Sequence, residues 1–560
     1  MNRKRVIVAI IFNFTAACFA ATYYVSPDGN DANDGLSSQA PWKTLSYASS
    51  HLPDGSTLVL MDGTYIGAVA ANRLQPPSGS EGAYTTVISA NDGKAVIDGS
   101  QFAGLYDYPV YINGKSYIRI EGLAIRNNAN AEVVFINNSD HVKFLRSSVI
   151  NKCNYNGSII GIYGDSHHLL LEDIWVAGAD RYGIILLQPT SVLNQAPHQI
   201  ILRRCVVRHD YRRRDDPPTS AQQYPAKGIQ VYGAQESESV LVTRDVLLQN
   251  NIAIDFNYGE EYWQMEGGCG STARVNDVGF YGNISLNIRG KGACLPDFGC
   301  SYPSLFSGFN VGGSRLGDGG NFTFINNVAW DASSGYNFSG GTSTLKNLVI
   351  NQNTAGNMHA DEGSCGPRGI YGSQSSLQVA AKNNLFYETL EPNRIDNPRA
   401  GFSYIEDYNW YYPASLVTSG AQNCLTTDPG IRYITQTTDN GSGESGAKRG
   451  AEVLLRYGVS GTLWGEPGYD QLTEESLWPF PYEDQIKEAF SETNDPPLNA
   501  YPASNNVKRG FCADGRGLYG GPITLTSYIW EYLGNAAPGW IYPSMPDTTP
   551  PAEPAGLNVE

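Results

Sequence analysis

The stretch Ile118-x-Ile120-x-x-Leu123-x-Ile125 contains a short apolar pattern that returns along the chain. The copies begin at Ile118, Val142, Leu169, Ile200, Leu241, Thr323 and Ser343. The first five start 24, 27, 31 and 41 residues apart, so the pattern is constant while the segments between copies vary. A period of two predicts a strand with one buried face. Because so short a unit cannot bury that face alone, neighbouring copies must stack on one another, as in a solenoid.

Short strands, Gly-rich turns and the lack of a long helical pattern between copies favour a right-handed parallel β-helix. A leucine-rich repeat would need a more regular spacing of Leu and Asn. We predict that residues 100–390 form the β-helix core and that residues 21–99 form the N-terminal cap and first coils. The pattern fades after residue 387, so residues 391–546 are predicted to be a C-terminal cap and lateral layer, with helices near residues 483–490 and 521–533.

The composition fits a turn-rich, acidic all-β protein. The chain has 560 residues, 61 of them Gly, and charged residues make up only 17%. That length is ordinary for a solenoid, which grows by adding coils. A formal net charge of -17 argues against nucleic acid as a general partner. We expect a monomer.

The N-terminal end of the chain indicates export, and the C-terminal end resembles a linker. Residues 1–20 resemble a secretory signal peptide, with a basic start, a short apolar run and a predicted cleavage after Ala20. The run from Thr15 to Cys18 also resembles a lipoprotein box, so a lipid anchor at the cell surface stays open. Residues 547–560 are rich in Pro and Thr, which is typical of a linker. Their last part, from Gly556 to Val559, resembles the start of a fibronectin type III module, a possible downstream partner.

Eight cysteines remain after removal of the signal peptide, and an even number in an exported chain permits disulfides. They are Cys153, Cys205, Cys269, Cys294, Cys300, Cys365, Cys424 and Cys512. Cys205 occupies an inward strand position, which predicts either a packed thiol or a buried bridge. No CxxC pair occurs, which argues against a zinc site.

Residues 23–65 carry a family resemblance. They read Tyr-Tyr-Val-Ser-Pro-Asp-Gly-Asn-Asp from Tyr23, then Pro-Trp-Lys-Thr-Leu from Pro41, then Asp-Gly-Thr-Tyr from Asp62. This opening resembles the N-terminal cap of secreted right-handed parallel β-helix proteins, including the pectate lyase-like group of polysaccharide lyases. The resemblance implies that a short helix plugs the first coil. Residues 41–52 suit that helix, with four inward side chains, Trp42, Leu45, Ala48 and Leu52.

A polar and aromatic ladder is predicted on one outward face of the solenoid. Second strands at residues 183–187, 228–232, 253–257, 335–339 and 355–359 are expected to stack. Their central inward residues are Leu186, Val231, Phe256, Phe338 and Met358. Their outward residues include Gln230, Tyr232, Asp255, Asn257, Asn337, Asn357, Ser339 and His359. Amides pair with sugar hydroxyls and rings cover sugar faces, so Gln230, Tyr232, Asn257 and Asn337 are candidate substrate-binding residues. A solvated sheet surface without a binding function would show the same pattern of outward polar residues in the sequence.

A basic insertion begins beside this ladder. Seven cations lie between residues 203 and 227: Arg203, Arg204, Arg208, Arg212, Arg213, Arg214 and Lys227. A cation beside a uronate would acidify its carbon-5 proton, and a nearby base could remove that proton. We predict Lys227 as the base and Arg208 or Arg212 as the group that holds the acid, while a surface charge run is the alternative.

Carboxylates near this insertion support a second hypothesis. Asp255 with Asp210, Asp215, Asp216 or Glu260 could supply the acid and base of a glycoside hydrolase. Asp215, Asp216 and Glu260 could instead hold calcium, which prefers several oxygen ligands. The sequence therefore favours a secreted polysaccharide lyase with Lys227, Arg208 and Asp255 in the site. A glycoside hydrolase and a non-catalytic adhesive β-helix remain alternatives.

Overall fold

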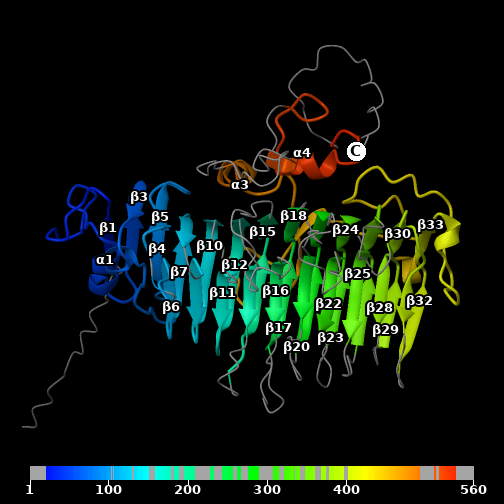
Figure 1. Ribbon diagram of the computed structural model, residues 1–560, viewed down its shortest axis with the longest axis horizontal. Coiled ribbons are helices and arrows are strands. Elements are labelled where there is room, and N and C mark those ends of the chain that lie inside the picture. Colours follow the sequence, from blue (N-terminus) through cyan, green and yellow to red (C-terminus); the bar gives the residue numbers. More distant parts are fainter. Residues whose placement is uncertain are drawn as a thin grey trace, which may run out of the picture.

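A computed structural model describes most of the chain beyond residue 20. It covers residues 21–102, 104, 106–128, 132–150, 158–177, 182–187, 195–208, 227–232, 243–256, 262–266, 275–288, 307–313, 321–332, 334–340, 347–359, 367–373, 378–396, 402–491, 510–512 and 516–537. The solenoid strands are parallel throughout and stack along one long axis (Figure 1). The predicted parallel β-helix is confirmed.

Each full coil contributes three strands, and each kind of strand forms its own stack. The first stack contains β1 (Thr22–Val25), β2 (Thr57–Leu60), β4 (Thr85–Ser89), β7 (Ser116–Glu121), β10 (Asp140–Ile150), β12 (His167–Ala177), β14 (His198–Arg203), β17 (Thr243–Gln249), β20 (Val275–Tyr281), β23 (Asn321–Ile325), β26 (Asn347–Asn351), β29 (Gln378–Lys382) and β32 (Ser403–Asp407). The long strands β10 and β12 bend and continue into the second stack.

The second stack pairs with the first in one large sheet. Besides the ends of β10 and β12 it contains β3 (Gly63–Ile66), β5 (Ala95–Gly99), β8 (Ala124–Asn128), β15 (Val206–Arg208), β18 (Ile252–Phe256), β21 (Ile284–Ile288), β24 (Val328–Ala332), β27 (Thr354–Gly356), β30 (Leu385–Tyr387) and β33 (Trp410–Tyr412). Coils therefore continue past residue 390, through β33.

The third stack is a separate sheet of ten strands. It contains β6 (Val110–Asn113), β9 (Val134–Asn137), β11 (Ser158–Tyr163), β13 (Tyr182–Leu187), β16 (Lys227–Tyr232), β19 (Tyr262–Glu266), β22 (Ser307–Gly313), β25 (Ser334–Gly340), β28 (Ile370–Ser373) and β31 (Arg394–Asp396). Figure 1 shows many of these strands side by side, and we call this stack the third sheet.

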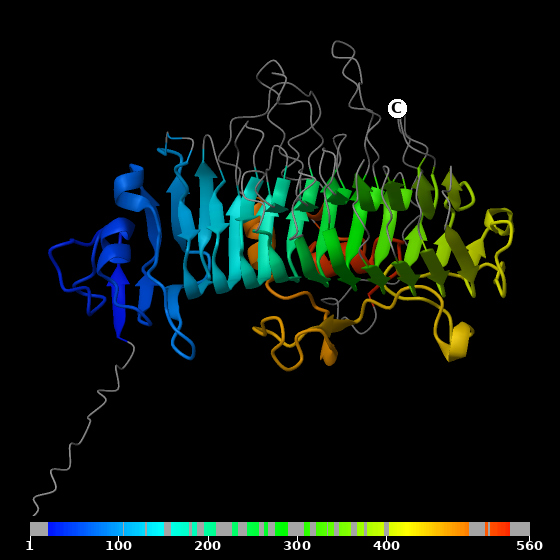
Figure 2. The same ribbon diagram turned by 90° about the horizontal axis from the view of Figure 1, so that it is seen from below.

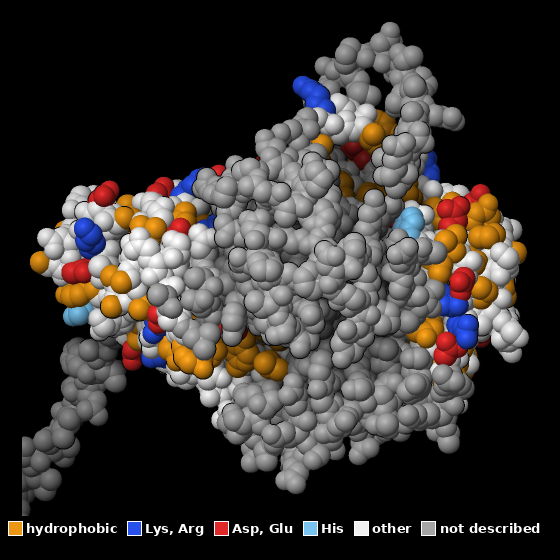
Figure 3. All heavy atoms as spheres, in the orientation of Figure 1, with side chains coloured by type: hydrophobic (Ala, Val, Ile, Leu, Met, Phe, Trp, Pro, Cys, Tyr) orange, Lys and Arg blue, Asp and Glu red, His pale blue; other side chains and the backbone are white. Residues whose placement is uncertain are grey.

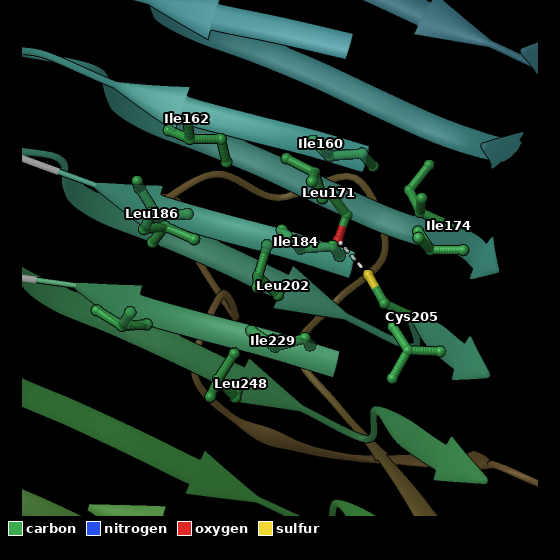
Figure 4. Close-up of a cluster of buried hydrophobic side chains, with 14 of the residues drawn as sticks. Ile160, Ile162, Leu171, Ile174, Ile184, Leu186, Leu202, Cys205, Ile229 and Leu248 are labelled. Atoms are coloured by element: carbon green, nitrogen blue, oxygen red, sulfur yellow. Dashed lines mark hydrogen bonds between the residues drawn. The ribbon is translucent and has the colours of Figure 1, made fainter. Parts of the chain in front are cut away.

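Aliphatic and aromatic side chains from all three stacks fill the interior. The predicted inward residues Leu186, Val231, Phe338 and Met358 are all buried in this core. The side chain of Phe256 lies outside the described residues. Figure 4 shows one section, where the thiol of Cys205 lies among Ile and Leu side chains and donates to the carbonyl of Leu171 at 3.5 Å. Burial raises the pKa of this thiol to about 12, so it is a packed thiol rather than a reactive group.

Disulfides remain a prediction. Cys205 and Cys424 are free thiols. Cys512 is buried in the C-terminal segment. The other predicted partners lie outside the described residues.

A ladder of buried asparagines runs through the later coils. Its members are Asn251, Asn283, Asn327, Asn353, Asn384 and Asn409. Each side-chain oxygen accepts from the backbone N–H of the member before it, at 2.8 to 2.9 Å, and Cys205 opens the ladder by donating to Asn251. Each amide nitrogen donates to a backbone carbonyl of the preceding coil. Polar side chains can lie inside this solenoid because the ladder satisfies them.

The N-terminal cap matches its prediction closely. Helix α1 (Leu45–His51) plugs the first coil, and Trp42, Leu45, Ala48 and Leu52 are all buried. Thr44 caps the helix by accepting from the backbone N–H of Tyr47. A second short helix, α2 (Val69–Asn72), contacts α1. No helix in the described ranges is long and apolar enough to cross a membrane.

The C-terminal segment returns along the outside of the large sheet (Figure 2). It contains β34 (Leu455–Tyr457), β35 (Leu472–Ser476), α3 (Glu483–Phe490) and α4 (Leu525–Trp530), so both predicted helices are present. Its apolar side chains cover the outward face of the second stack, where Ile254, Leu286 and Trp330 lie. We call residues 427–537 of this segment the lateral layer.

Residues 451–488 of the lateral layer meet the coils in reverse order. The backbone N–H of Ala451 donates to Thr354, that of Glu452 to Asn326, that of Tyr457 to Asn250, and that of Gly461 to Glu172. Glu488 of α3 then pairs with Lys94 of an early coil. These contacts hold many coils to one continuous strip of chain.

Candidate functional site

The outward face of the third sheet carries a straight row of side-chain positions. Strand pairing places Ile185 beside Gln230, Gln230 beside Gln264, and so on through Asn310, Asn337 and Tyr371. The same row begins in earlier coils with Tyr111, Phe135 and Gly161. Four successive amide positions therefore follow an apolar section. We call the positions Gln230, Gln264, Asn310 and Asn337 the amide row.

The described members of the amide row are buried and under-satisfied. Gln230 and Asn337 are both 0% exposed. Neither the oxygen nor the nitrogen of either amide has a hydrogen-bond partner among the described residues, and the oxygen of Asn310 also lacks one there. Leaving a buried amide unpaired costs about 1–3 kcal/mol. Such groups, repeated on one face, are typical of a site that a polar ligand completes.

The apolar section of the row is built from stacked rings. Phe135 lies between Tyr108 and Tyr163, with ring centroids 4.3 and 5.1 Å away. Gly161 leaves room for this ring, because a Cβ there would lie 2.3 Å from the ring of Tyr163 and the ring would have to shift. Burial and the neighbouring Glu132 raise the pKa of Tyr163 well above its ordinary value, so its hydroxyl stays protonated and donates to Glu132 at 2.6 Å.

Charged side chains lie near both ends of the described part of this side (Figure 3), and its C-terminal end carries two arginines, Arg368 and Arg394. There Arg368 pairs with Glu391 and lies 5.6 Å from the ring centre of Tyr371, while Arg394 pairs with Asp396. The amide row itself contains no charged residue at its four positions. Its chemistry is therefore that of neutral hydrogen bonding.

Lys227, Gln230 and Tyr232 all belong to β16, as one strand of the predicted ladder requires. Lys227 begins the strand, at the rim where the chain enters the third sheet, and lies three residues before Gln230. Only the backbone of Lys227 and Tyr232 is described. Asn337 lies on the same row three strands further along.

The prediction that Asp255 lies beside Gln230 and Lys227 was wrong. Asp255 belongs to β18 in the second stack, whereas Lys227 pairs with Tyr182 and Tyr262 in the third sheet. The predicted strand at residues 355–359, which contains Asn357 and His359, also belongs elsewhere. It begins in β27 of the second stack, and His359 comes three residues after the end of that strand. The five predicted strands merged two stacks, because both stacks place an apolar residue beside a polar one.

Asp255 lies in the interface between solenoid and lateral layer. Its carboxylate accepts from Asn287 at 3.0 Å, from the backbone N–H of Phe511 at 3.1 Å and from the hydroxyl of Tyr528 at 2.5 Å. Arg208 lies 3.5 Å away, and both side chains are buried. Burial and the nearby carboxylate keep the pKa of Tyr528 well above its ordinary value, so Tyr528 remains a donor. These contacts place Asp255 and Arg208 in a packed structural cluster.

The predicted basic patch is also divided by the fold. Arg203 and Arg204 are buried and bind Glu172 and Asp173 beneath the lateral layer. With Arg208 bound to Asp255, three of the seven cations face the lateral layer rather than the third sheet. Five predicted site residues lie outside the described residues, namely Arg212, Asp215, Asp216, Asn257 and Glu260. Within the described ranges no group of three or more His, Cys, Asp or Glu side chains could hold a metal ion.

Sequence reasoning missed Gln264 and Asn310, although a signal for Asn310 was present. Residues 307–311 read Ser-Gly-Phe-Asn-Val and residues 334–338 read Ser-Gly-Tyr-Asn-Phe. This repeated motif lies on adjacent strands, β22 and β25. The glycine is required in β25 because a Cβ at Gly335 would lie 2.7 Å from the carbonyl of Gly369. Matching the motif would have aligned the third sheet correctly.

A histidine cluster lies on the outward face of the first stack. His141 stacks on His168 at 4.8 Å, and the Nδ1 atoms of His167 and His168 are 2.9 Å apart. His198 packs against His167, and Asp140 contacts His141. Burial and the neighbouring histidines lower the pKa of His168 from 6.5 to about 4, and they lower that of His167 as well.

This cluster predicts a loss of stability in mild acid. Between pH 6.5 and about 4 the unfolded chain binds protons at His168 that the folded chain does not, so the free energy of unfolding falls as the pH falls through that window. The pKa of Asp140 is lowered from its ordinary value of 3.8. Its protonation therefore changes the stability only below pH 3.8, outside this window. We expect His168→Gln to flatten the pH dependence of the urea midpoint.

The matched control is His51→Gln, because His51 lies on α1 far from the cluster. Its pH dependence should follow that of the wild type. A His168→Gln profile that runs parallel to the wild type would contradict this role for the cluster.

Comparisons with known proteins assign no family to the chain. No family model matches the chain. The uncharacterized protein YwoF of Bacillus subtilis (strain 168) is 27% identical over 180 residues, which are 31% of this chain, and the chain spans about a third (33%) of that relative's length. Among solved structures, pectate lyase Pel9A is 16% identical with a TM-score of 0.40, over 69% of this chain and 81% of its own. A rhamnogalacturonan lyase is 13% identical with a TM-score of 0.38, over 73% and 85%.

Proposed function

We propose that this protein is a carbohydrate-active β-helix protein that binds a polysaccharide along the third sheet, parallel to the solenoid axis. The proposal is carried by the buried amides of Gln230 and Asn337 on one outward row, which have no hydrogen-bond partner among the described residues. An amide both donates and accepts, as a sugar hydroxyl does. Parallel strands lie about 4.8 Å apart, which is close to the length of one sugar in an extended chain. Successive amides could therefore meet successive sugars.

We further propose that the protein is a polysaccharide lyase in which Lys227 is the base. Lys227 begins β16 at the rim of the third sheet, on the same strand as Gln230. In β-elimination a base removes the proton at carbon 5 of a uronate, while a cation neutralises the carboxylate. Arg208 is bound to Asp255, which leaves Arg212, or calcium bound by Asp215, Asp216 and Glu260, for the second task.

In the hydrolase alternative, Asp255 is not available as a catalytic carboxylate. The four groups around Asp255 occupy both of its oxygens and hold it under the lateral layer. A general acid or nucleophile must instead reach the glycosidic bond. The lyase proposal does not require Asp255.

The reaction class can be tested with the purified protein and a panel of acidic and neutral polysaccharides. A lyase produces an unsaturated sugar that absorbs in the ultraviolet, so absorbance should rise together with new reducing ends. New reducing ends without that absorbance would show a hydrolase. Binding without any product would show a non-catalytic adhesive protein.

The binding face can be tested by replacing its unpaired amides. Gln230→Met and Asn337→Leu remove hydrogen-bonding groups that pay a desolvation cost in the free protein. We expect each variant to be as stable as the wild type or more stable by up to about 1 kcal/mol. Each should bind the polysaccharide roughly 5- to 30-fold more weakly, the equivalent of one or two hydrogen bonds.

Asn353→Leu is the matched control for stability. Asn353 is equally buried, but its amide is bonded within the asparagine ladder. This control should be clearly destabilised, because Asn327 and Phe324 would lose their partners. If Asn337→Leu is destabilised to the same extent, or binds polysaccharide as tightly as the wild type, the third sheet is not the binding face.

We also propose that the protein acts outside the cell, as a monomer, through the signal peptide of residues 1–20. The first strand, β1, begins at Thr22. N-terminal sequencing of the protein recovered from the medium of its source should begin at Ala21. An intact Met1 in the cell-associated protein would contradict export.

A further inference from the structure

His359 is held by a buried carboxylate at the edge of the third sheet. Its Nε2 contacts the carboxylate of Asp331, while 29% of its side chain remains exposed. Its backbone N–H donates to the carbonyl of Ala332 at 2.9 Å, two residues before β25 begins at Ser334. His359 therefore lies at the rim where the chain passes from the second stack into the third sheet.

Asp331 is fixed from both sides. Tyr532 of the lateral layer, just beyond α4, donates its hydroxyl to one carboxylate oxygen at 2.5 Å, and Asn357 donates to the other at 3.3 Å. The carboxylate is almost completely buried. An ionised carboxylate only accepts hydrogen bonds, so neutral His359 must carry its proton on Nε2. The ring nitrogen Nδ1 is then an acceptor of fixed orientation.

The same rim carries Lys227. Lys227 lies three residues before Gln230, and Ser334 lies three residues before Asn337. Strands β16 and β25 are three pairings apart in the third sheet, a separation of about 14 Å. That distance is too long for both side chains to act on one glycosidic bond. It corresponds to about three sugars of an extended chain.

We propose that His359 is a substrate-binding residue, whose Nδ1 accepts a hydrogen bond from a sugar hydroxyl about three sugars from the bond that Lys227 acts on. Asp331 is its positioning residue. This inference rests on the proposed function. It predicts that His359 contributes only to ligands long enough to reach from Lys227 to the start of β25.

The experiment compares short oligosaccharides with longer ones that span both ends. They are prepared from the polysaccharide of the panel that the wild type binds most tightly. We expect His359→Ala to weaken binding of the longer oligomers about fivefold, the value of one hydrogen bond, and to leave the short ones unchanged. His51→Ala, on α1, should change neither.

Asp331→Asn provides the test of positioning. An amide in that place can donate to Nε2, which would move the imidazole proton to Nδ1 and remove the acceptor. The 15N shifts of the His359 ring should report this exchange of tautomer, and affinity for the longer oligomers should fall about as far as in His359→Ala. A purely structural role for Asp331 would lower the melting temperature without that dependence on ligand length.

The outcomes separate this inference from the proposed function. If the wild type binds no polysaccharide of the panel, both fail. If the wild type binds but His359→Ala binds long oligomers as tightly, or loses short and long ones equally, the binding role of His359 fails alone.

Discussion

Lys227→Ala is expected to lower turnover of the preferred polysaccharide about a hundredfold or more, because a positioned general base typically contributes that much. Its affinity for the polysaccharide should change little, since the amide row remains intact. Lys227→Arg gives the sharper result. Arginine keeps the positive charge but stays protonated, so it could bind an acid group without removing a proton. It should be as inactive as the alanine variant and bind as tightly as the wild type.

Lys382→Ala is the control, because Lys382 belongs to β29 in the first stack and pairs with Glu444. It should keep full activity. Undiminished turnover in Lys227→Ala would remove Lys227 from the mechanism. Recovery of turnover in Lys227→Arg would show that its task is charge recognition.

Arg204→Met is expected to lower the free energy of unfolding by about 3–5 kcal/mol, because it leaves a buried carboxylate without its partner. Arg204 binds Asp173 through two hydrogen bonds of 2.7 and 2.9 Å. It also binds Glu172, and it reaches Ser460 of the lateral layer. Burial raises the pKa of Asp173, and Arg204 opposes that shift. A urea titration followed by circular dichroism would measure the loss.

The paired variant Arg204→Met with Asp173→Asn should recover part of the loss, because it removes the unpaired charge. Asparagine suits this position, since Asp173 has a φ of +56°. Arg244→Met is the surface control, with its partner Asp245 and a partly exposed side chain. It should cost well under 1 kcal/mol. Equal losses in Arg204→Met and Arg244→Met would mean that the buried ion pair contributes no more than a surface one.

The sequence predicted the early coils correctly. Ile118, Val142, Leu169 and Ile200 occupy equivalent positions on adjacent strands, as the first four copies of the pattern require. The fifth copy was misplaced, because Ile200 aligns with Val246 rather than with Leu241. In the later coils a buried asparagine of the ladder occupies the third apolar position of the pattern. A search for apolar residues alone does not find these coils in the correct register.

The lateral layer explains the remaining errors. Val328 and Trp330 occupy the third and fourth positions of the pattern in the copy that begins at Thr323, which predicts that they face inward. They lie on the outward face of the second stack, where residues of the lateral layer cover them. Strands of the second stack are therefore buried on both faces. Alternation with a period of two cannot show which of these faces points into the interior. The same ambiguity placed Asp255 on the wrong stack, whereas Gln230 and Asn337 were assigned to the correct one.

The contacts that the region around α4 makes with two different coils constrain how this protein can evolve. Solenoids commonly lengthen or shorten by duplicating or losing a repeat. Here Tyr528 and Tyr532, four residues apart around α4, bind Asp255 and Asp331, which lie two strands apart in the second stack. A coil inserted between β18 and β24 would separate the two aspartates beyond the reach of one helical turn. Homologues should therefore vary in length in the loops and at the C-terminal end, while the number of coils under α4 stays constant.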